Sequence, residues 1–438
     1  MMTLPTCIAN GCGLFLTLTS YLTTFLFLGA ALILTLQSRF AQIRMFPRFV
    51  RLVMGSIKKQ TDTRTDAMSP FHALFTAMGT TIGMGNIVGP GVAILMGGPG
   101  ALVWLIMYIF FASVTKFVEV TFALHTRTVS PEGKIIGGPM RYLHTVSPFL
   151  GYWYAYIAVF LFTAWTSLQA NTLANIFELE LIPKYMVGGL LACIVFAALH
   201  GGAQRVGNIA SKLVPIMFIL YICFAFTLLY QNIGALGHAF HLIFVGAFTP
   251  QALVGSLSGF TILQAMRVGT YKAIFITEAG MGTSSIAHAM ADTKNPTDQG
   301  ILAMFSMLSD ALIALTSGLL VIVLGVYNGP FRSTMIYEAF RLGSPVAGRF
   351  VLLATVSLFV VTTAIGNSFN GMQTFASLTR HRFVWAYMAL TVCMIFVGPL
   401  LDAKLMWDIA DVVLALVAIP NIIGILILAY RKPEVIKV

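Results

Sequence analysis

Charged residues are scarce in this sequence. Only 9% of its 438 residues are Asp, Glu, Lys or Arg, whereas water-soluble globular chains contain about 25%. Hydrophobic residues make up 58% of the chain, and the mean hydropathy is +0.88. This composition excludes a water-soluble fold and leaves no room for a soluble domain. It indicates an all-α polytopic membrane protein.

Residues for covalent or metal chemistry are also few. A nucleophile beside a base, or a cluster of metal ligands, is not legible in the sequence, so we expect neither an enzyme nor a bound cofactor. The five cysteines show no paired metal spacing and are predicted to be packing residues. They are Cys7, Cys12, Cys193, Cys223 and Cys393.

Long apolar runs, by contrast, recur along the whole chain. About eleven are read as transmembrane helices. The first is expected to be a retained helix rather than a cleaved signal peptide, because no charge precedes it and a basic cluster follows it. The windows are 14–36, 71–95, 101–124, 149–171, 186–199, 213–230, 253–278, 301–326, 350–374, 383–400 and 405–430.

The net charge of +11 is distributed very unevenly among the connections. Most Lys and Arg residues, including the cluster from Arg39 to Arg64, fall in loops on one side of the eleven spans. The positive-inside rule then places the N-terminus outside and the C-terminus in the cytoplasm. The charge therefore reports membrane orientation and gives no reason to expect a nucleic-acid partner.

Glycine and proline interrupt the second window. The segment 80–91 reads TTIGMGNIVGPG, which predicts a helix that unwinds inside the bilayer. Such a break is tolerated only where the freed backbone groups line a cavity or meet a ligand. The alternative is that these glycines only let helices pack closely. A dinucleotide-binding fingerprint is rejected, because the spacing is one residue too long and no strand precedes it.

A second interruption lies about 200 residues later, in the segment 278–285, EAGMGTSS. Each break falls in the first helix of a set of five, which predicts an inverted repeat preceded by one extra helix. The expected divisions are 1–69 for the extra helix and a basic segment, 70–232 for the first repeat, and 233–438 for the second repeat and a short tail. Paired broken helices indicate a transporter.

Polar side chains recur on the faces of two other spans. Thr363, Asn367 and Asn370 are spaced i, i+4 and i+7 and share one helix face. Adjacent threonine hydroxyls suit a hard cation such as sodium, and the amide of Gln169 suits a zwitterion. The alternative for each is a hydrogen bond that only joins two helices.

Charged residues within spans require separate explanations, because each is costly in a bilayer. Lys116 and Glu119 are spaced i, i+3 and are expected to neutralise each other. Glu278 adjoins the second break and is the better candidate for ordering the unwound segment or for coupling to a cation.

With these segments in view, the sequence resembles the alanine or glycine:cation symporter family over nearly its whole length. The resemblance rests on an ordered set of motifs, together with Lys116 and Glu119. The motifs are Thr81-x-Gly83-x-Gly85-Asn86-Ile87, Gly97-Gly98-Pro99-Gly100-Ala101, Gly137-Gly138-Pro139-Met140 and Glu278-Ala279-Gly280-Met281-Gly282.

The resemblance implies a LeuT-type fold, a bacterial inner-membrane location and sodium-driven import of alanine or glycine, in some members D-alanine. Sodium, or in some members a proton, is then the coupling ion. The residues implied around the substrate are Thr81, Gly83, Gly85, Gln169, Phe275, Gly280, Gly282, Thr363 and Asn367. Those implied around sodium are Gly79, Ile82, Thr362 and Thr363.

Three positions depart from the family pattern. Thr277 stands where an asparagine is usual, and Asn367 and Met372 stand where a tryptophan and a glutamate are expected. Asn367 would enlarge and polarise the pocket wall, so the substrate stays open. Two other functions also stay open: a proton-coupled carrier of another small solute, and a sensor that binds an amino acid without transporting it.

Overall fold

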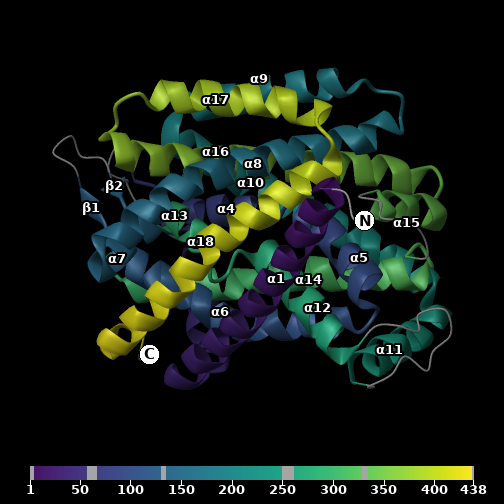
Figure 1. Ribbon diagram of the computed structural model, residues 1–438, viewed down its shortest axis with the longest axis horizontal. Helices are drawn as coiled ribbons and strands as arrows, with labels where there is room; N and C mark the ends of the chain where they lie inside the picture. The colour runs from purple at the N-terminus through teal and green to yellow at the C-terminus, as the bar shows by residue number, and fades with distance from the viewer. Residues whose placement is uncertain (1–3, 57–66, 130–134, 249–260, 328–333, 437–438) are drawn as a thin grey trace.

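The computed structural model describes residues 4–56, 67–129, 135–248, 261–327 and 334–436, with side chains from Tyr21 onward. This part of the chain is almost entirely helical (Figure 1). Its one sheet is a short antiparallel pair, β1 (Thr128–Val129) and β2 (Ile135–Ile136), in which Thr128 lies opposite Ile136. The all-α class expected from the sequence is confirmed.

The helices of the bundle mostly follow the apolar windows, and the exception is the 7-residue helix Thr283–Ala289, which lies between two windows. In chain order they are α1 (Leu4–Gln37), α4 (Pro70–Thr81), α5 (Met84–Gly97), α6 (Ala101–His125), α8 (Pro148–Glu178), α9 (Lys184–Leu199), α10 (Gly202–Gln231), α12 (Ile262–Thr277), α13 (Thr283–Ala289), α14 (Pro296–Val323), α16 (Ala347–Thr379), α17 (Val384–Val397) and α18 (Ala403–Arg431). The remaining helices are α2 (Ala41–Arg44), α3 (Phe46–Ser56), α7 (Pro139–Val146), α11 (Ile233–Phe248) and α15 (Met335–Gly343), with 3₁₀ turns η2 (Gly398–Leu400) and η3 (Pro433–Val435).

Within the described residues, seven helices are long and apolar enough to cross a membrane, and shorter apolar helices accompany them. This supports a multi-pass membrane protein. The expected window 253–278 begins outside the described residues, and its described helix starts at Ile262. Helix α11, of 16 residues, was not predicted from the sequence.

Both interruptions are true helix breaks, but the first is shorter than its sequence suggested. Helix α4 ends at Thr81, and α5 begins at Met84, so Ile82 and Gly83 alone are unwound. Pro90 lies inside α5, whereas the sequence placed it in the unwound segment. The second break runs from Glu278 to Gly282, between α12 and α13. We call these two segments the first break and the second break.

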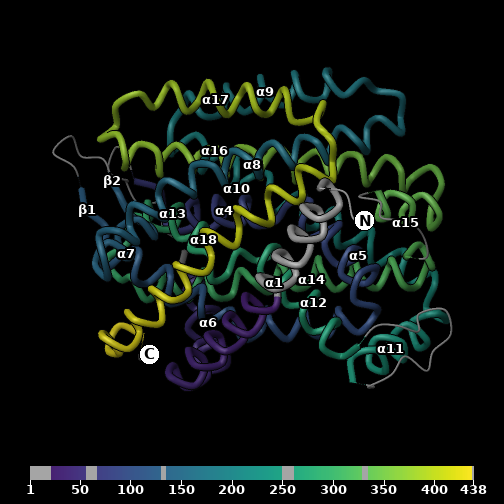
Figure 2. Tube along the Cα trace, viewed as in Figure 1, coloured from purple at the N-terminus to yellow at the C-terminus, as the bar shows by residue number. Residues whose placement is uncertain are grey.

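The helices pack as an inverted repeat of five and five. The two broken helices lie side by side, with α5 against α12 and α4 against α13. The following helices also contact their counterparts: α6 packs on α14, α8 on α16, and α9 on α17. Figure 2 shows α9 and α17 running together beyond α8 and α16. Helices α1 and α18 cross the face toward the viewer in Figure 1 and contact each other.

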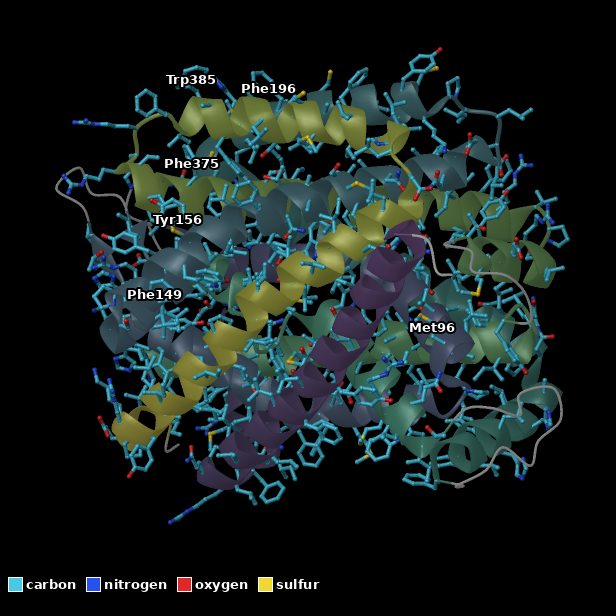
Figure 3. All side chains as sticks on the ribbon, in the orientation of Figure 1. Met96, Phe149, Tyr156, Phe196, Phe375 and Trp385 are labelled. Atoms are coloured by element: carbon cyan, nitrogen blue, oxygen red, sulfur yellow. The ribbon has the colours of Figure 1, made fainter. Side chains whose placement is uncertain are left out.

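The outer surface of the bundle carries large apolar side chains. Phe149, Tyr156, Phe196 and Trp385 point outward from the helices (Figure 3), and each is exposed. Such a surface fits contact with lipid rather than with water. Cys193, Cys223 and Cys393 are also exposed. The expectation that the cysteines are packing residues is therefore wrong for these three, because a membrane helix can bear apolar residues on its outer face too.

Candidate functional site

Polar side chains from three helices hold the first break. The amide N–H of Gly83 donates to Asn86 Oδ1 at 3.2 Å, and the N–H of Met84 donates to Gln169 Oε1 at 3.2 Å. The Thr363 hydroxyl of α16 donates to the carbonyl of Ile82, also at 3.2 Å. The N-terminus of α5 therefore lies beside α8 and α16, deep in the bundle.

The second break is held by a different set of side chains. Four carbonyls in or next to it accept hydrogen bonds from side chains of α6, α8 and α18. The pairs are Lys116 Nζ with Thr277 O (3.1 Å), Tyr108 OH with Ala279 O (2.9 Å), Asn421 Nδ2 with Gly280 O (2.8 Å) and Tyr154 OH with Met281 O (2.9 Å). These donors satisfy backbone groups that no water could reach within a bilayer.

The expected ion pair between Lys116 and Glu119 is not what the structure forms. Lys116 reaches the carbonyl of Thr277, and Glu119 accepts from Asn421 Nδ2 at 2.7 Å. The i, i+3 spacing was the only signal in the sequence, and it could not reveal that the second break supplies a competing carbonyl. The Lys116 ammonium still interacts electrostatically with Glu119, and also with Glu278 and Asp310.

Replacing Lys116 with methionine is expected to destabilise the folded protein by about 1–3 kcal/mol. The change keeps an unbranched side chain, one atom shorter, but leaves the buried Thr277 carbonyl without its donor. Thermal unfolding in detergent, followed by the recovery of monodisperse protein, measures the loss. Lys184→Met is the matched control, because Lys184 pairs with the largely exposed Glu178 and such surface pairs contribute little. Equal melting of the two variants would contradict the proposed support.

Helix α16 joins both breaks. Besides the Thr363 bond to the first break, Asn370 Nδ2 donates to the carbonyl of Thr283 at 3.3 Å, at the start of α13. Asn367 lies between them on the same face and is only 1% exposed. The shared face inferred from the i, i+4, i+7 spacing is therefore directed at the two broken helices.

A small cavity lies where these elements meet. Its volume is about 10 Å³, which is room for about one water molecule. The cavity is lined by Thr80, Thr81, Gly85, Trp165, Gln169, Phe275, Glu278 and Asn367. Five of the substrate residues expected from the family resemblance are thus brought together from α4, α5, α8, α12 and α16. Their role as substrate ligands stays a prediction.

Two further expected residues, Gly83 and Thr363, are not part of the cavity lining, but Gly83 lies next to Thr363 and to Gln169. A Cβ atom on Gly83 would lie 2.7 Å from Thr363 Oγ1 and 3.4 Å from Gln169 Nε2. Gly83 therefore has no side chain because α16 and Gln169 occupy the space. The backbone of Gly83 is extended, with φ of −137°, and any residue could adopt it. The lack of space, rather than the backbone conformation, therefore explains the glycine.

The glycines of the second break do not join the cavity lining. A Cβ atom on Gly280 would lie 2.5 Å from the Phe27 ring of α1, and one on Gly282 would lie 2.4 Å from Pro139. Both residues have positive φ, 90° and 76°. Their lack of a side chain serves chain reversal and close packing, and the sequence could not separate that role from substrate contact.

The expected sodium residues meet at the contact between α4 and α16. The Ile82 carbonyl and the Thr363 hydroxyl are already hydrogen-bonded, and a Cβ on Gly79 would lie 3.6 Å from Thr362 Cβ. The Thr362 hydroxyl instead donates within α16, to Leu358 O at 2.9 Å and Phe359 O at 3.0 Å. Carbonyl and hydroxyl oxygens of this kind are the ligands that a hard cation prefers.

Sequence reasoning missed Trp165 and Thr80 as cavity residues. Trp165 lies one helical turn before Gln169, so the i, i+4 spacing on α8 could have indicated it. Its ring packs edge-on against Phe275, with centroids 5.4 Å apart. Glu278, named earlier for ordering the second break, lies on the cavity wall in the left-handed region with φ of 57° and is hydrogen-bonded by Thr283.

Two discontinuous helices that lie antiparallel around a central polar cavity define a LeuT-type transporter. The solved structure of MhsT in complex with L-phenylalanine has this fold. It matches with a TM-score of 0.61 and 16% sequence identity, covering 84% of this chain and 90% of that chain. At this identity the likeness supports the fold alone.

The chain belongs to the sodium:alanine symporter family, whose profile matches residues 10–438. It is 32% identical to the sodium/alanine symporter AgcS of Methanococcus maripaludis, covering 92% of this chain and 91% of that protein. It is 30% identical to the probable sodium/glutamine symporter GlnT of Bacillus subtilis, covering 92% and 84%. The family is one of sodium-coupled amino-acid symporters and not of enzymes.

Proposed function

We propose that this protein imports a small neutral amino acid in symport with sodium, by alternating access. Alanine and glycine, with D-alanine among them, are the first candidates. The observation that carries the proposal is a polar cavity at which both broken helices, α8 and α16 meet. An amino acid there would touch elements of both repeats, as alternating access requires.

The cavity offers opposite charges for the two ends of a zwitterion. The N-terminus of α5, at Gly85, carries the positive end of a helix dipole and suits a carboxylate. Glu278 on the same cavity wall suits the ammonium group. Since side chains already occupy carbonyls of the second break, the Glu278 carboxylate is the better ammonium partner there.

Sodium is proposed to bind where α4 meets α16. The Ile82 carbonyl and the Thr363 hydroxyl would be ligands, together with the backbone near Gly79 and Thr362. The support is the 3.2 Å approach of the first two atoms beside an unwound segment. Because Ile82 follows Thr81, which lines the substrate cavity, a bound cation would hold backbone directly beside that cavity.

We further propose the cell inner membrane as the location, with the N-terminus outside, the C-terminus in the cytoplasm, and repeats at 70–232 and 233–438. Loops on the cytoplasmic side then carry most of the basic residues. Leu181, 92% exposed between α8 and α9, would face outward. The Leu181→Cys variant tests this orientation, and we expect a membrane-impermeant maleimide to label it in intact cells. Labelling only after the cells are lysed would mean that the orientation is the reverse.

Uptake in proteoliposomes tests the function. We expect labelled alanine or glycine to accumulate under an imposed sodium gradient, and not under a potassium gradient of equal size. A panel of D- and L-amino acids as competitors identifies the substrate. Empty liposomes are the control for leakage. Accumulation driven by a proton gradient without sodium would favour the proton-coupled carrier, and saturable binding without uptake would favour the sensor.

A further inference from the structure

Two residues that line the cavity each have a buried polar atom without a hydrogen-bond partner. One atom is the indole Nε1 of Trp165, a donor, and the other is the amide Oδ1 of Asn367, an acceptor. Trp165 is 3% exposed and Asn367 is 1% exposed. Buried polar atoms are nearly always paired in folded proteins, so an unpaired donor and an unpaired acceptor on one cavity indicate a ligand that supplies both partners.

The other polar side chains of the cavity each have at least one hydrogen bond within the protein. Gln169 Oε1 accepts from Met84 N, and the Glu278 carboxylate accepts from Thr283. The hydroxyls of Thr80 and Thr81 donate to carbonyls of their own helix, at 2.7 Å and 3.3 Å. Among the cavity-lining residues, Trp165 Nε1 and Asn367 Oδ1 are the polar atoms that are both buried and without a partner.

The tryptophan is held in place by its neighbours. Its ring packs edge-on against Phe275, which in turn packs on Trp407 with centroids 5.2 Å apart. The Lys272 ammonium lies 5.2 Å from the Trp407 ring centroid. This stack fixes the indole, so its N–H cannot easily turn to another partner within the protein.

We propose, resting on the amino-acid transport proposed above, that among the small amino acids that enter this site, those with a side-chain hydroxyl bind more tightly than apolar ones of the same size. One hydroxyl oxygen both donates, to Asn367 Oδ1, and accepts, from Trp165 Nε1. It is also the smallest group that does so, which suits a cavity of about 10 Å³. The site then selects serine or threonine over apolar amino acids of the same size.

Isosteric pairs provide the test. Serine and 2-aminobutyrate have the same number of heavy atoms, as do threonine and valine, so each pair differs at the hydroxyl. Inhibition of sodium-driven alanine uptake is measured for both members, in the enantiomer that the protein prefers. We expect serine and threonine to inhibit at concentrations about 10-fold or more below their apolar partners, because the apolar partner leaves both buried atoms unpaired.

Variants at Trp165 and Asn367 test whether the preference for a hydroxyl depends on Trp165 Nε1 and Asn367 Oδ1. Asn367→Leu removes the acceptor at similar volume, and Trp165→Phe removes the donor. Each should bring the serine to 2-aminobutyrate ratio close to one, and a ratio within one variant is independent of its transport rate. Trp104→Phe is the matched control, because Trp104 Nε1 is also buried and unpaired but does not line the cavity. It should keep the wild-type ratio.

The outcomes separate this inference from the proposed function. Sodium-driven alanine uptake with equal inhibition by serine and 2-aminobutyrate would overturn the hydroxyl inference alone, because the two polar atoms would then serve the main-chain ends of the substrate. A preference for asparagine over leucine with none for serine would replace the hydroxyl by a carboxamide and also overturn it. No sodium-driven uptake of any amino acid would overturn the proposed function itself.

Discussion

Replacing Gly83 with leucine is expected to reduce uptake by roughly 5- to 150-fold, with normal insertion into the membrane. A side chain at Gly83 would start 2.7 Å from Thr363 Oγ1 and 3.2 Å from its methyl group. Leucine would therefore push α16 away from the first break and displace Gln169 from the cavity. Overpacking of this kind costs about 1–3 kcal/mol, which corresponds to the expected range. Uptake normalised to the amount of protein in the membrane measures it.

Gly29→Leu is the matched control for this variant. Gly29 also lies in a long apolar helix, α1, but a side chain there would meet nothing within 4 Å. Leucine favours the membrane in both variants, so both should insert. Normal transport by Gly83→Leu would mean that this glycine only packs helices, and it would remove the first break from the substrate path.

Replacing Thr363 with valine is expected to weaken the apparent affinity for sodium about 10-fold. Valine keeps the shape of threonine but lacks the hydroxyl, which lies 3.2 Å from the Ile82 carbonyl. Removing one oxygen ligand from a hard-cation site, together with its bond to the carbonyl, justifies a change of that order. The sodium concentration that gives half-maximal uptake, measured at saturating substrate, reports the shift.

Thr355→Val separates a sodium ligand from an ordinary helix threonine. Thr355 is equally buried on α16, but its hydroxyl donates to carbonyls of its own helix, Val351 O and Leu352 O. This variant should keep the wild-type dependence on sodium. If Thr363→Val also keeps it at equal protein level, Thr363 is not part of the cation site, and the contact between α4 and α16 is only structural.

Several features of the site could be foreseen because they depend on local rules. Glycine in an apolar span predicted both breaks, since a bilayer tolerates unwound backbone only beside a cavity. The i, i+4, i+7 spacing on α16 predicted one polar face. The sequence could not show which side chains each glycine contacts. Gly83 and Gly280 look alike in sequence, yet one adjoins Thr363 and the other adjoins Phe27 of α1.

The sequence by itself determined the membrane class, the number of repeats and the two breaks, because hydropathy, charge asymmetry and glycine placement act over short stretches of chain. Only the tertiary structure decided the composition of the cavity. Trp165 and Asn367 are about 200 residues apart, and the packing of α8 against α16 brings them to one wall. The same packing leaves their polar atoms unpaired, a property that depends on every neighbouring side chain and therefore has no local signal.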